Sequence, residues 1–182
     1  VGLAMYLLLG APLAAIMEGL QNWLSSMSGS SAVLLGIILG LMMCFDLGGP
    51  VNKAAYLFAT AGLSTGDESS MQIMAAVMAS GMVAPIALSL ATFIRKSLFT
   101  PAEQENGKSA WLLGLSFVSE GAIPFAAADP FRVIPSMMAG GAVTGAISMA
   151  LSVGSRAPHG GVFVFFAIDP FWGYLVAIAA GV

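Results

Sequence analysis

The chain has 182 residues, of which 58% are hydrophobic and 8% are charged, and its formal net charge is −3. Soluble domains carry about 25% charged residues, and a soluble chain this apolar would expose large aggregation-prone patches. The composition therefore predicts an integral membrane protein. No basic patch suits a nucleic acid, and one histidine with one cysteine cannot build a metal site based on those ligands.

The chain opens with an apolar stretch over residues 1–17, followed by Glu18 and by a polar stretch over residues 21–31. Trp23 lies near this boundary and fits an interfacial anchor. Because the first residue is a valine inside an apolar stretch, we expect residues 1–182 to be one membrane domain that is a fragment of a longer polypeptide.

Residues 32–45 form an apolar run that predicts a short transmembrane helix, or half of a broken one. This run contains Cys44, which we interpret as a small packing residue. The motif DLGGPVNKAAY at residues 46–56 then interrupts the helix, because glycine and proline break helical structure. A second short apolar run continues to residue 63.

The next segments indicate an orientation in the bilayer. The loop over residues 64–70 carries two acids and no base, and residues 71–94 predict a full span with Pro85 as a candidate kink site. The hydrophilic stretch over residues 95–109 holds three of the six basic residues. The positive-inside rule places this stretch on the cytoplasmic side, so the acidic loop falls outside.

Residues 111–125 predict another short apolar helix, which ends in the motif SEGAIPF with Glu120 at the end of the helix. A longer run rich in glycine, alanine, methionine and serine follows over residues 133–153. It contains Gly141 and Gly145, a spacing of small residues that suits close packing of helices.

The tripeptide Asp-Pro-Phe occurs twice, beginning at Asp129 and at Asp169. Aspartate accepts backbone N–H bonds at helix starts, and proline suits the first helical position, so we interpret both copies as helix starts. Between them the motif GSRAPHGG at residues 154–161 interrupts the pattern, and residues 162–168 are a short apolar piece. A final helix is predicted over residues 171–182.

Long apolar segments thus alternate with short ones that end in glycine, proline and a charge. Irregular backbone at membrane depth is tolerated only inside protein or beside a water-filled cavity. Paired short, interrupted segments indicate the binding site of a transporter. The pattern predicts an all-α integral membrane protein whose transmembrane helices include broken, re-entrant hairpin segments.

The first candidate site lies between Asp46 and Lys53. A charge near the bilayer centre costs at least about 2.5–3.5 kcal/mol, and these two side chains flank one turn, so they could simply neutralise each other. Alternatively, Asn52 and the amides of Gly48 and Gly49 could bind the hydroxyls of a sugar.

Glu120 is the second candidate, because it has no neighbouring base and Gly121 and Pro124 interrupt the backbone after it. An unpaired carboxylate inside a membrane indicates a functional site, and the alternative is a glutamate at the water interface.

His159, the single histidine, is the third candidate. It could shuttle a proton or bind a hydroxyl, or it could be merely solvated, and the two glycines that follow it permit close backbone approach.

Three blocks, DLGGPVNKAAY at residues 46–56, SEGAIPF at residues 119–125 and SRAPHGG at residues 155–161, resemble the signatures of the fructose-family enzyme IIC domain. This domain is the membrane component of the bacterial phosphoenolpyruvate-dependent sugar phosphotransferase system. The resemblance covers essentially the whole chain, and the order and spacing of the blocks make it specific.

The resemblance implies a permease that binds a sugar from outside and presents it for phosphorylation by a phosphocysteine on a partner IIB domain. It implies catalytic roles for Glu120 and His159, and sugar contacts from these two residues and from Asp46, Gly48, Gly49, Asn52, Lys53 and Gly121. We expect no cofactor and no metal, and fructose as the sugar, with mannose or a mannosyl conjugate as alternatives. We also expect a homodimer with several spans in the bacterial inner membrane, and a longer protein with further N-terminal spans and IIA and IIB domains.

Two other classes of function stay open. An ion-coupled secondary transporter also uses broken helices and carboxylates at mid-membrane. A membrane assembly subunit that transports nothing is suggested by the small residues at positions 140–145. Dependence of uptake on phosphoenolpyruvate and IIB, or instead on a proton gradient, distinguishes the permease from the ion-coupled transporter, and sugar binding by the full-length protein counts against the assembly subunit.

Overall fold

The computed structural model of the chain describes residues 15, 19, 32–64 and 66–182. The predictions for the apolar stretch over residues 1–17 and for Trp23 therefore lie almost entirely outside the described residues.

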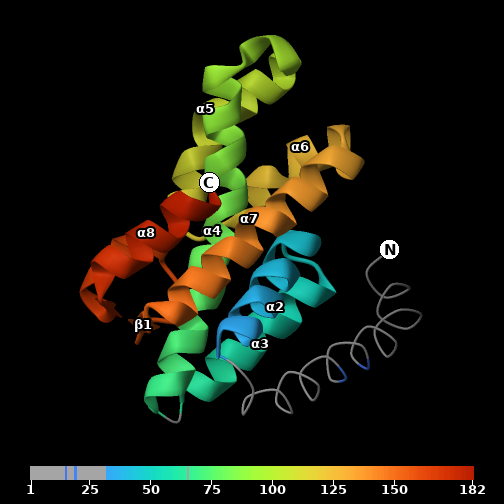
Figure 1. The fold of residues 1–182 in the computed structure, drawn as a ribbon. Helices are drawn as coiled ribbons and strands as arrows, with labels where there is room; N and C mark the ends of the chain where they lie inside the picture. Colours follow the sequence, from blue (N-terminus) through green and yellow to red (C-terminus); the bar gives the residue numbers. More distant parts are fainter. Residues whose placement is uncertain (1–14, 16–18, 20–31, 65) are drawn as a thin grey trace.

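The described residues form helices joined by short turns, with one pair of two-residue strands (Figure 1). The strands β1 and β2 are antiparallel and pair Gly154 with Asp169 and Ser155 with Ile168. In chain order the elements are α2 (Ala32–Phe45), α3 (Pro50–Leu63), α4 (Glu68–Ile94), η1 (Lys96–Leu98), α5 (Pro101–Leu115), η2 (Ser119–Ala122), α6 (Ile123–Ala128), α7 (Pro130–Ala150), β1 (Gly154–Ser155), η3 (Gly161–Ala167), β2 (Ile168–Asp169) and α8 (Phe171–Gly181).

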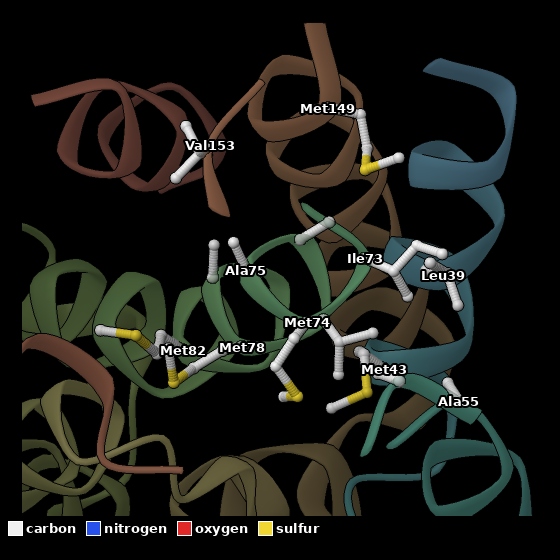
Figure 2. Close-up of a cluster of buried hydrophobic side chains, with 14 of the residues drawn as sticks. Leu39, Met43, Ala55, Ile73, Met74, Ala75, Met78, Met82, Met149 and Val153 are labelled. Atoms are coloured by element: carbon white, nitrogen blue, oxygen red, sulfur yellow. The ribbon is translucent and has the colours of Figure 1, made fainter. Parts of the chain in front are cut away.

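Helix α4 forms the centre of the fold. It contacts α2, α3, α5, α7 and α8, and every residue from Ile73 to Pro85 is buried. Figure 2 shows Met74, Met78 and Met82 of α4 in one cluster with Met43 of α2 and Met149 of α7. The apolar run at residues 71–94 was predicted as one long helix, and this prediction is confirmed. The helix begins slightly earlier, at Glu68, because the Asp67 carboxylate caps it.

Two helices among the described residues, α4 with 27 residues and α7 with 21, are long and apolar enough to cross a membrane. Helix α2 has the predicted bounds of residues 32–45 but is shorter than a full span. Its Cys44 is fully buried, as expected of a packing residue.

Helices α2 and α7 cross with their backbones in contact. A Cβ atom on Gly36 would overlap the carbonyl oxygen of Gly145, and one on Gly40 would overlap that of Gly141. Each helix thus has two glycines four residues apart, and each glycine faces one on the other helix. The backbone of the facing helix occupies the space that a side chain would need. The close packing predicted for Gly141 and Gly145 is confirmed, and its partner is a helix of the same chain.

The hydrophilic stretch at residues 95–109 is partly helical, since α5 begins at Pro101. Thr100 and Glu103 form a capping box: Thr100 N donates to Glu103 Oε2 at 2.8 Å, and Glu103 N donates to Thr100 Oγ1 at 3.4 Å. This reciprocal pair satisfies two backbone N–H groups at the helix start.

Helix α5 ends at Leu115, so the prediction of one helix over residues 111–125 with Glu120 at its end is wrong. The chain turns at Phe117, whose φ is 64°. Phe117 N donates to Gly114 O at 3.0 Å and Val118 N donates to Leu113 O at 2.9 Å. These two bonds are the Schellman pattern that closes a helix. Glu120 consequently lies one turn beyond the helix, in η2.

The two Asp-Pro-Phe tripeptides differ in structure. The Asp129 carboxylate accepts the Arg132 N–H at 3.3 Å and caps α7, as predicted. A helix also starts after the second copy, but Asp169 does not cap it, which corrects the prediction. The reason is that Asp169 is held in strand β2, where its backbone pairs with Gly154.

Most of the basic residues lie at one end of the molecule. Arg95 and Lys96 follow the C-terminal end of α4, Lys108 lies in α5, and Arg132 shares a cavity with Ala91 and Phe99. These bases are four of the six in the chain. The acids Asp67 and Glu68 lie at the other end of α4. Bases and acids thus lie at opposite ends of this helix, and the predicted orientation in the bilayer rests on this separation.

Candidate functional site

A cavity of about 190 Å³ lies where the three sequence motifs meet. Its lining comes from the end of α2, the first two turns of α3, the turn after α5, the start of η2 and the loop between β1 and η3. The lining residues are Met43, Asn52, Lys53, Tyr56, Phe117, Ser119, Glu120 and His159. Segments more than 100 residues apart in the sequence therefore contribute to one small polar cavity.

Glu120 lies at this cavity with an exposed side chain. Within the described part of the chain its carboxylate has no hydrogen bond and no ion pair. The backbone of Gly48 passes beside it with a φ of +103°, and a Cβ atom there would lie 2.7 Å from Glu120 Oε1. Glycine suits this position for two reasons: its φ is positive, and a side chain here would overlap the Glu120 carboxylate.

Asp46 and Asn52 organise the start of α3. The Asp46 carboxylate accepts Val51 N at 2.8 Å and Asn52 N at 2.9 Å. Asn52 is buried, and its Nδ2 donates to Met43 O at 2.7 Å. No ion pair joins Asp46 to Lys53. Asp46 therefore satisfies backbone N–H groups at the helix start, and a helix N-terminus favours a negative charge there.

Aromatic rings form one wall of the cavity. The ring of His159 lies 5.0 Å from that of Phe117 and 6.5 Å from that of Tyr56, centroid to centroid. Lys53 Nζ lies 6.0 Å from the centroid of the Tyr56 ring. The cavity thus pairs an apolar, aromatic side with the polar groups of Asn52 and Glu120.

The loop that carries His159 is held against the end of α5. Gly160 and Gly161 have φ values of 122° and 59°, a region that favours glycine. A Cβ atom on Gly161 would overlap the carbonyl oxygen of Leu115. The predicted close backbone approach is confirmed at Gly161, whereas a Cβ atom on Gly160 would meet the side chain of Val164. The same loop places the imidazole of His159 beside Phe117.

The predicted site residues divide into two groups. Those lining the cavity are Asn52, Lys53, Glu120 and His159, whereas Asp46, Gly48, Gly49 and Gly121 lie outside its lining. A Cβ atom on Gly49 would meet Asp46, and one on Gly121 would meet Leu113 and Pro85, so both glycines serve packing.

Four lining residues were not among the predicted site residues. Tyr56 and Ser119 stand inside the quoted motifs, which was a usable signal. Met43 and Phe117 are apolar residues in apolar runs, and nothing in the sequence separates them from ordinary core residues. Among the described residues, no group of three or more acids, histidines or cysteines is placed to hold a metal ion.

The fold and the cavity define a class of protein: an apolar helical protein with helices long enough to cross a membrane and a small polar cavity at the ends of shorter helices. No protein-family model matches the sequence, and no solved structure matches the fold. Among curated proteins, the chain is 58% identical over 184 residues to the PTS system fructose-specific EIIB'BC component of Escherichia coli, covering 100% of this chain and 32% of that protein.

Two further relatives have different lengths. The PTS system fructose-specific EIIC component of Haloferax volcanii is 53% identical over 161 residues, covering 88% of this chain and 42% of that protein. The fructose permease IIC component of Bacillus amyloliquefaciens is 44% identical over 180 residues, covering 99% and 58%. The chain thus spans about a third of the Escherichia coli relative. It belongs to the fructose family of enzyme IIC domains, as the three motifs predicted.

Proposed function

We propose that the chain is the sugar-translocating part of a phosphoenolpyruvate-dependent sugar phosphotransferase system. It binds fructose or a related sugar and presents it for phosphorylation by a phosphocysteine on IIB. The names of the relatives support fructose as the sugar, and a name that joins B and C supports IIB as the partner.

The observation that carries the proposal is the meeting of Glu120, His159 and Asn52 at one cavity of about 190 Å³. This volume is roughly that of six liquid waters, which suits one small polar molecule and is below the about 300–1,000 Å³ typical of larger ligands. The amide of Asn52 and the Glu120 carboxylate offer hydrogen bonds to sugar hydroxyls. The rings of Phe117 and Tyr56 offer a surface for the C–H face of the sugar.

The carboxylate of Glu120 supplies the proton acceptor for the reaction. It orients the acceptor hydroxyl and takes its proton as the hydroxyl oxygen attacks phosphorus. The P–O bond forms, the P–S bond to the IIB cysteine breaks, and the thiolate leaves. Phosphoryl transfer needs chiefly positioning and charge stabilisation. Lys53 is the cation beside the cavity, and His159 hydrogen-bonds the sugar.

The setting of this reaction is part of the same proposal. Helices α2 and α3, with the break between them, and the η2–α6 segment are re-entrant pieces that bring the cavity to mid-membrane. The protein crosses the bacterial inner membrane several times, works as a homodimer, and includes further N-terminal spans with IIA and IIB domains. The short helices of 14, 14 and 6 residues support the re-entrant assignment, because a span needs about 20 residues.

Energy coupling tests the proposal against ion-coupled transport. Fructose uptake by cells that carry the full-length protein is measured with the proton gradient collapsed, and separately without phosphoenolpyruvate or IIB. We expect uptake to persist in the first condition and to stop in the second. The opposite result would overturn the proposal.

Glu120→Gln tests the assigned proton acceptor. General-base catalysis contributes about 10²–10⁴-fold to a rate, so fructose phosphorylation should fall by at least a hundredfold while the amount of membrane-inserted protein stays the same. Glu105→Gln is the matched control, since Glu105 is exposed and does not line the cavity. It pairs with Lys108 in α5, close to where Gly107 packs on Thr92 near the C-terminal end of α4. Full activity of Glu120→Gln would refute the role.

A further inference from the structure

A second, larger cavity of about 510 Å³ lies at the start of α4, outside the candidate site. It is formed by the first turns of α4, the turn after α7 and the strands β1 and β2. The polar side chains in its lining are Glu68, Gln72, Ser152, Arg156 and Asp169. None of them lines the candidate site.

Two opposite charges in this cavity lack partners. Among the residues that the structure describes, neither the Arg156 guanidinium nor the Asp169 carboxylate has a hydrogen bond or an ion pair. Their backbones are nevertheless fixed: Arg156 N donates to Ala167 O at 2.9 Å, and Asp169 pairs with Gly154 in the two-stranded bridge. Both side chains are exposed, so on a fixed backbone each presents its charge to a ligand in the cavity.

The chemistry of the lining favours a neutral ligand with many hydroxyls. Glu68 and Asp169 outnumber Arg156, so the cavity has a net charge of −1 and disfavours an anion such as a sugar phosphate. Guanidinium, carboxylate and amide groups are planar and bind neighbouring hydroxyls through paired hydrogen bonds. Phe166, 78% exposed, adds an aromatic surface for the C–H face of a sugar.

The cavity also lies at the end of the molecule from which a sugar would arrive. It is at the end of α4 opposite the cluster of four bases, which the positive-inside rule assigns to the cytoplasm. Ten residues of α4, about 15 Å of helix rise, separate Met71 in this cavity from Gly81, beside the Phe117 ring of the candidate site. The loop that holds Arg156 here also holds His159 there.

We propose that this cavity is an outer capture site, which binds the non-phosphorylated sugar at the outer face before the sugar reaches Glu120. The ligand class rests on the proposed function, whereas the place of the site rests on Arg156, Asp169 and the cavity around them. The outer site is required only for sugar that comes from outside.

Sidedness of the assay separates this site from the candidate site. Membrane vesicles with the full-length protein are prepared in two orientations. Right-side-out vesicles are loaded with phosphoenolpyruvate and the soluble phosphoryl donors. Inside-out vesicles receive the same donors in the medium. Fructose phosphorylation is measured in both for Arg156→Gln and Asp169→Asn. The matched control is Arg132→Gln, the same change at the opposite end of the molecule.

We expect each outer variant to raise the KM for fructose at least about tenfold in right-side-out vesicles, the effect of one hydrogen bond to a charged group. The KM in inside-out vesicles and both values for Arg132→Gln should change by less than about twofold, the range of surface substitutions. An equal change in the two orientations, or none in right-side-out vesicles, overturns the inference.

Asp169→Asn carries the same test if Arg156→Gln lowers the amount of folded protein. Glu120→Gln should lower the rate in both orientations. If it lowers neither, the proposed function fails while the sidedness of the Arg156 and Asp169 effects still decides whether an outer site exists.

Discussion

The α2–α7 crossing and the candidate cavity both depend on glycine, but they use it differently. At the crossing, Gly36 and Gly40 lie inside the regular helix α2 and let its backbone touch that of α7. Beside the cavity, Gly48 lies in the turn between α2 and α3 and Gly161 is the first residue of η3, and both have positive φ values. In the first region the missing side chain permits close packing of two helices. In the second it permits a positive φ and, at Gly48, leaves room for the Glu120 carboxylate.

This difference separates scaffold from site. The crossing has small residues, and the buried Ser80 hydroxyl of α4 lies beside it and donates to Gly141 O. The cavity has exposed charged and aromatic groups on short segments, including Glu120 and His159. A substitution in the first region should therefore change stability, and one in the second should change activity at nearly constant stability.

Gly40→Ala should have the largest effect on stability. Helix propensity alone predicts a gain of about 1 kcal/mol for glycine to alanine, but the new Cβ atom would overlap the carbonyl oxygen of Gly141. Overpacking costs about 1–3 kcal/mol, so we expect a lower unfolding temperature in detergent. Val143→Ile adds one carbon on the exposed face of α7 and should have little effect. A higher unfolding temperature for Gly40→Ala would contradict the close crossing.

Gly48→Ala should mainly affect activity. The added Cβ atom would lie 2.7 Å from Glu120 Oε1 and displace the carboxylate, so we expect kcat/KM for phosphorylation to fall about tenfold, or about 1.4 kcal/mol in transition-state stabilisation. Gly66→Ala imposes a similar backbone strain at a φ of +72°, where a Cβ atom meets nothing within 4 Å. Equal losses of activity in the two variants would show that strain alone is responsible.

Asp46→Ala distinguishes a helix cap from a sugar contact. Loss of a cap costs about 1 kcal/mol of stability, so the unfolding temperature should fall about as much as in Asp67→Ala, which removes the cap of α4. The KM for fructose should change little in both variants. A rise of tenfold or more in the KM of Asp46→Ala alone would support the predicted sugar contact.

Ser148→Ala should have the smallest effect, with the opposite sign. The Ser148 hydroxyl is fully buried and has no hydrogen-bond partner among the described residues. Removing an unsatisfied buried group is neutral or stabilises by up to about 1 kcal/mol. Ser80→Ala is the matched comparison, since Ser80 Oγ donates to Gly141 O at 3.1 Å. A clear loss of stability in Ser148→Ala would indicate a partner for this hydroxyl.

The helices with strong local signals were predictable from the sequence. Apolar runs gave α2 and most of α4, and Asp129 followed by proline gave the start of α7. The start of α5 had a signal as well, the capping-box spacing of Thr100 and Glu103, but it lies in a hydrophilic stretch and is easily taken for a loop. The end of α5 had none, because Phe117 occupies a left-handed position where glycine is usual.

The candidate site was predictable only in part, for a similar reason. In an apolar chain a polar residue stands out, so Asn52, Glu120 and His159 were found from the sequence. Met43 and Phe117 resemble the rest of the chain. The role of Gly48 depends on a contact with Glu120 from a segment some 70 residues away, which no local pattern contains.

The glycine contacts between α2 and α7 have a consequence for motion. Two helices whose backbones touch at Gly36, Gly40, Gly141 and Gly145 cannot slide along each other without a clash of carbonyl groups. The proposed transport would require the cavity to open alternately to the two sides of the membrane. In such a movement α2 and α7 would move as one rigid body. The dihedral changes of such a hinge then fall on the break that follows α2, at Leu47 and Gly48, where both φ angles are already positive.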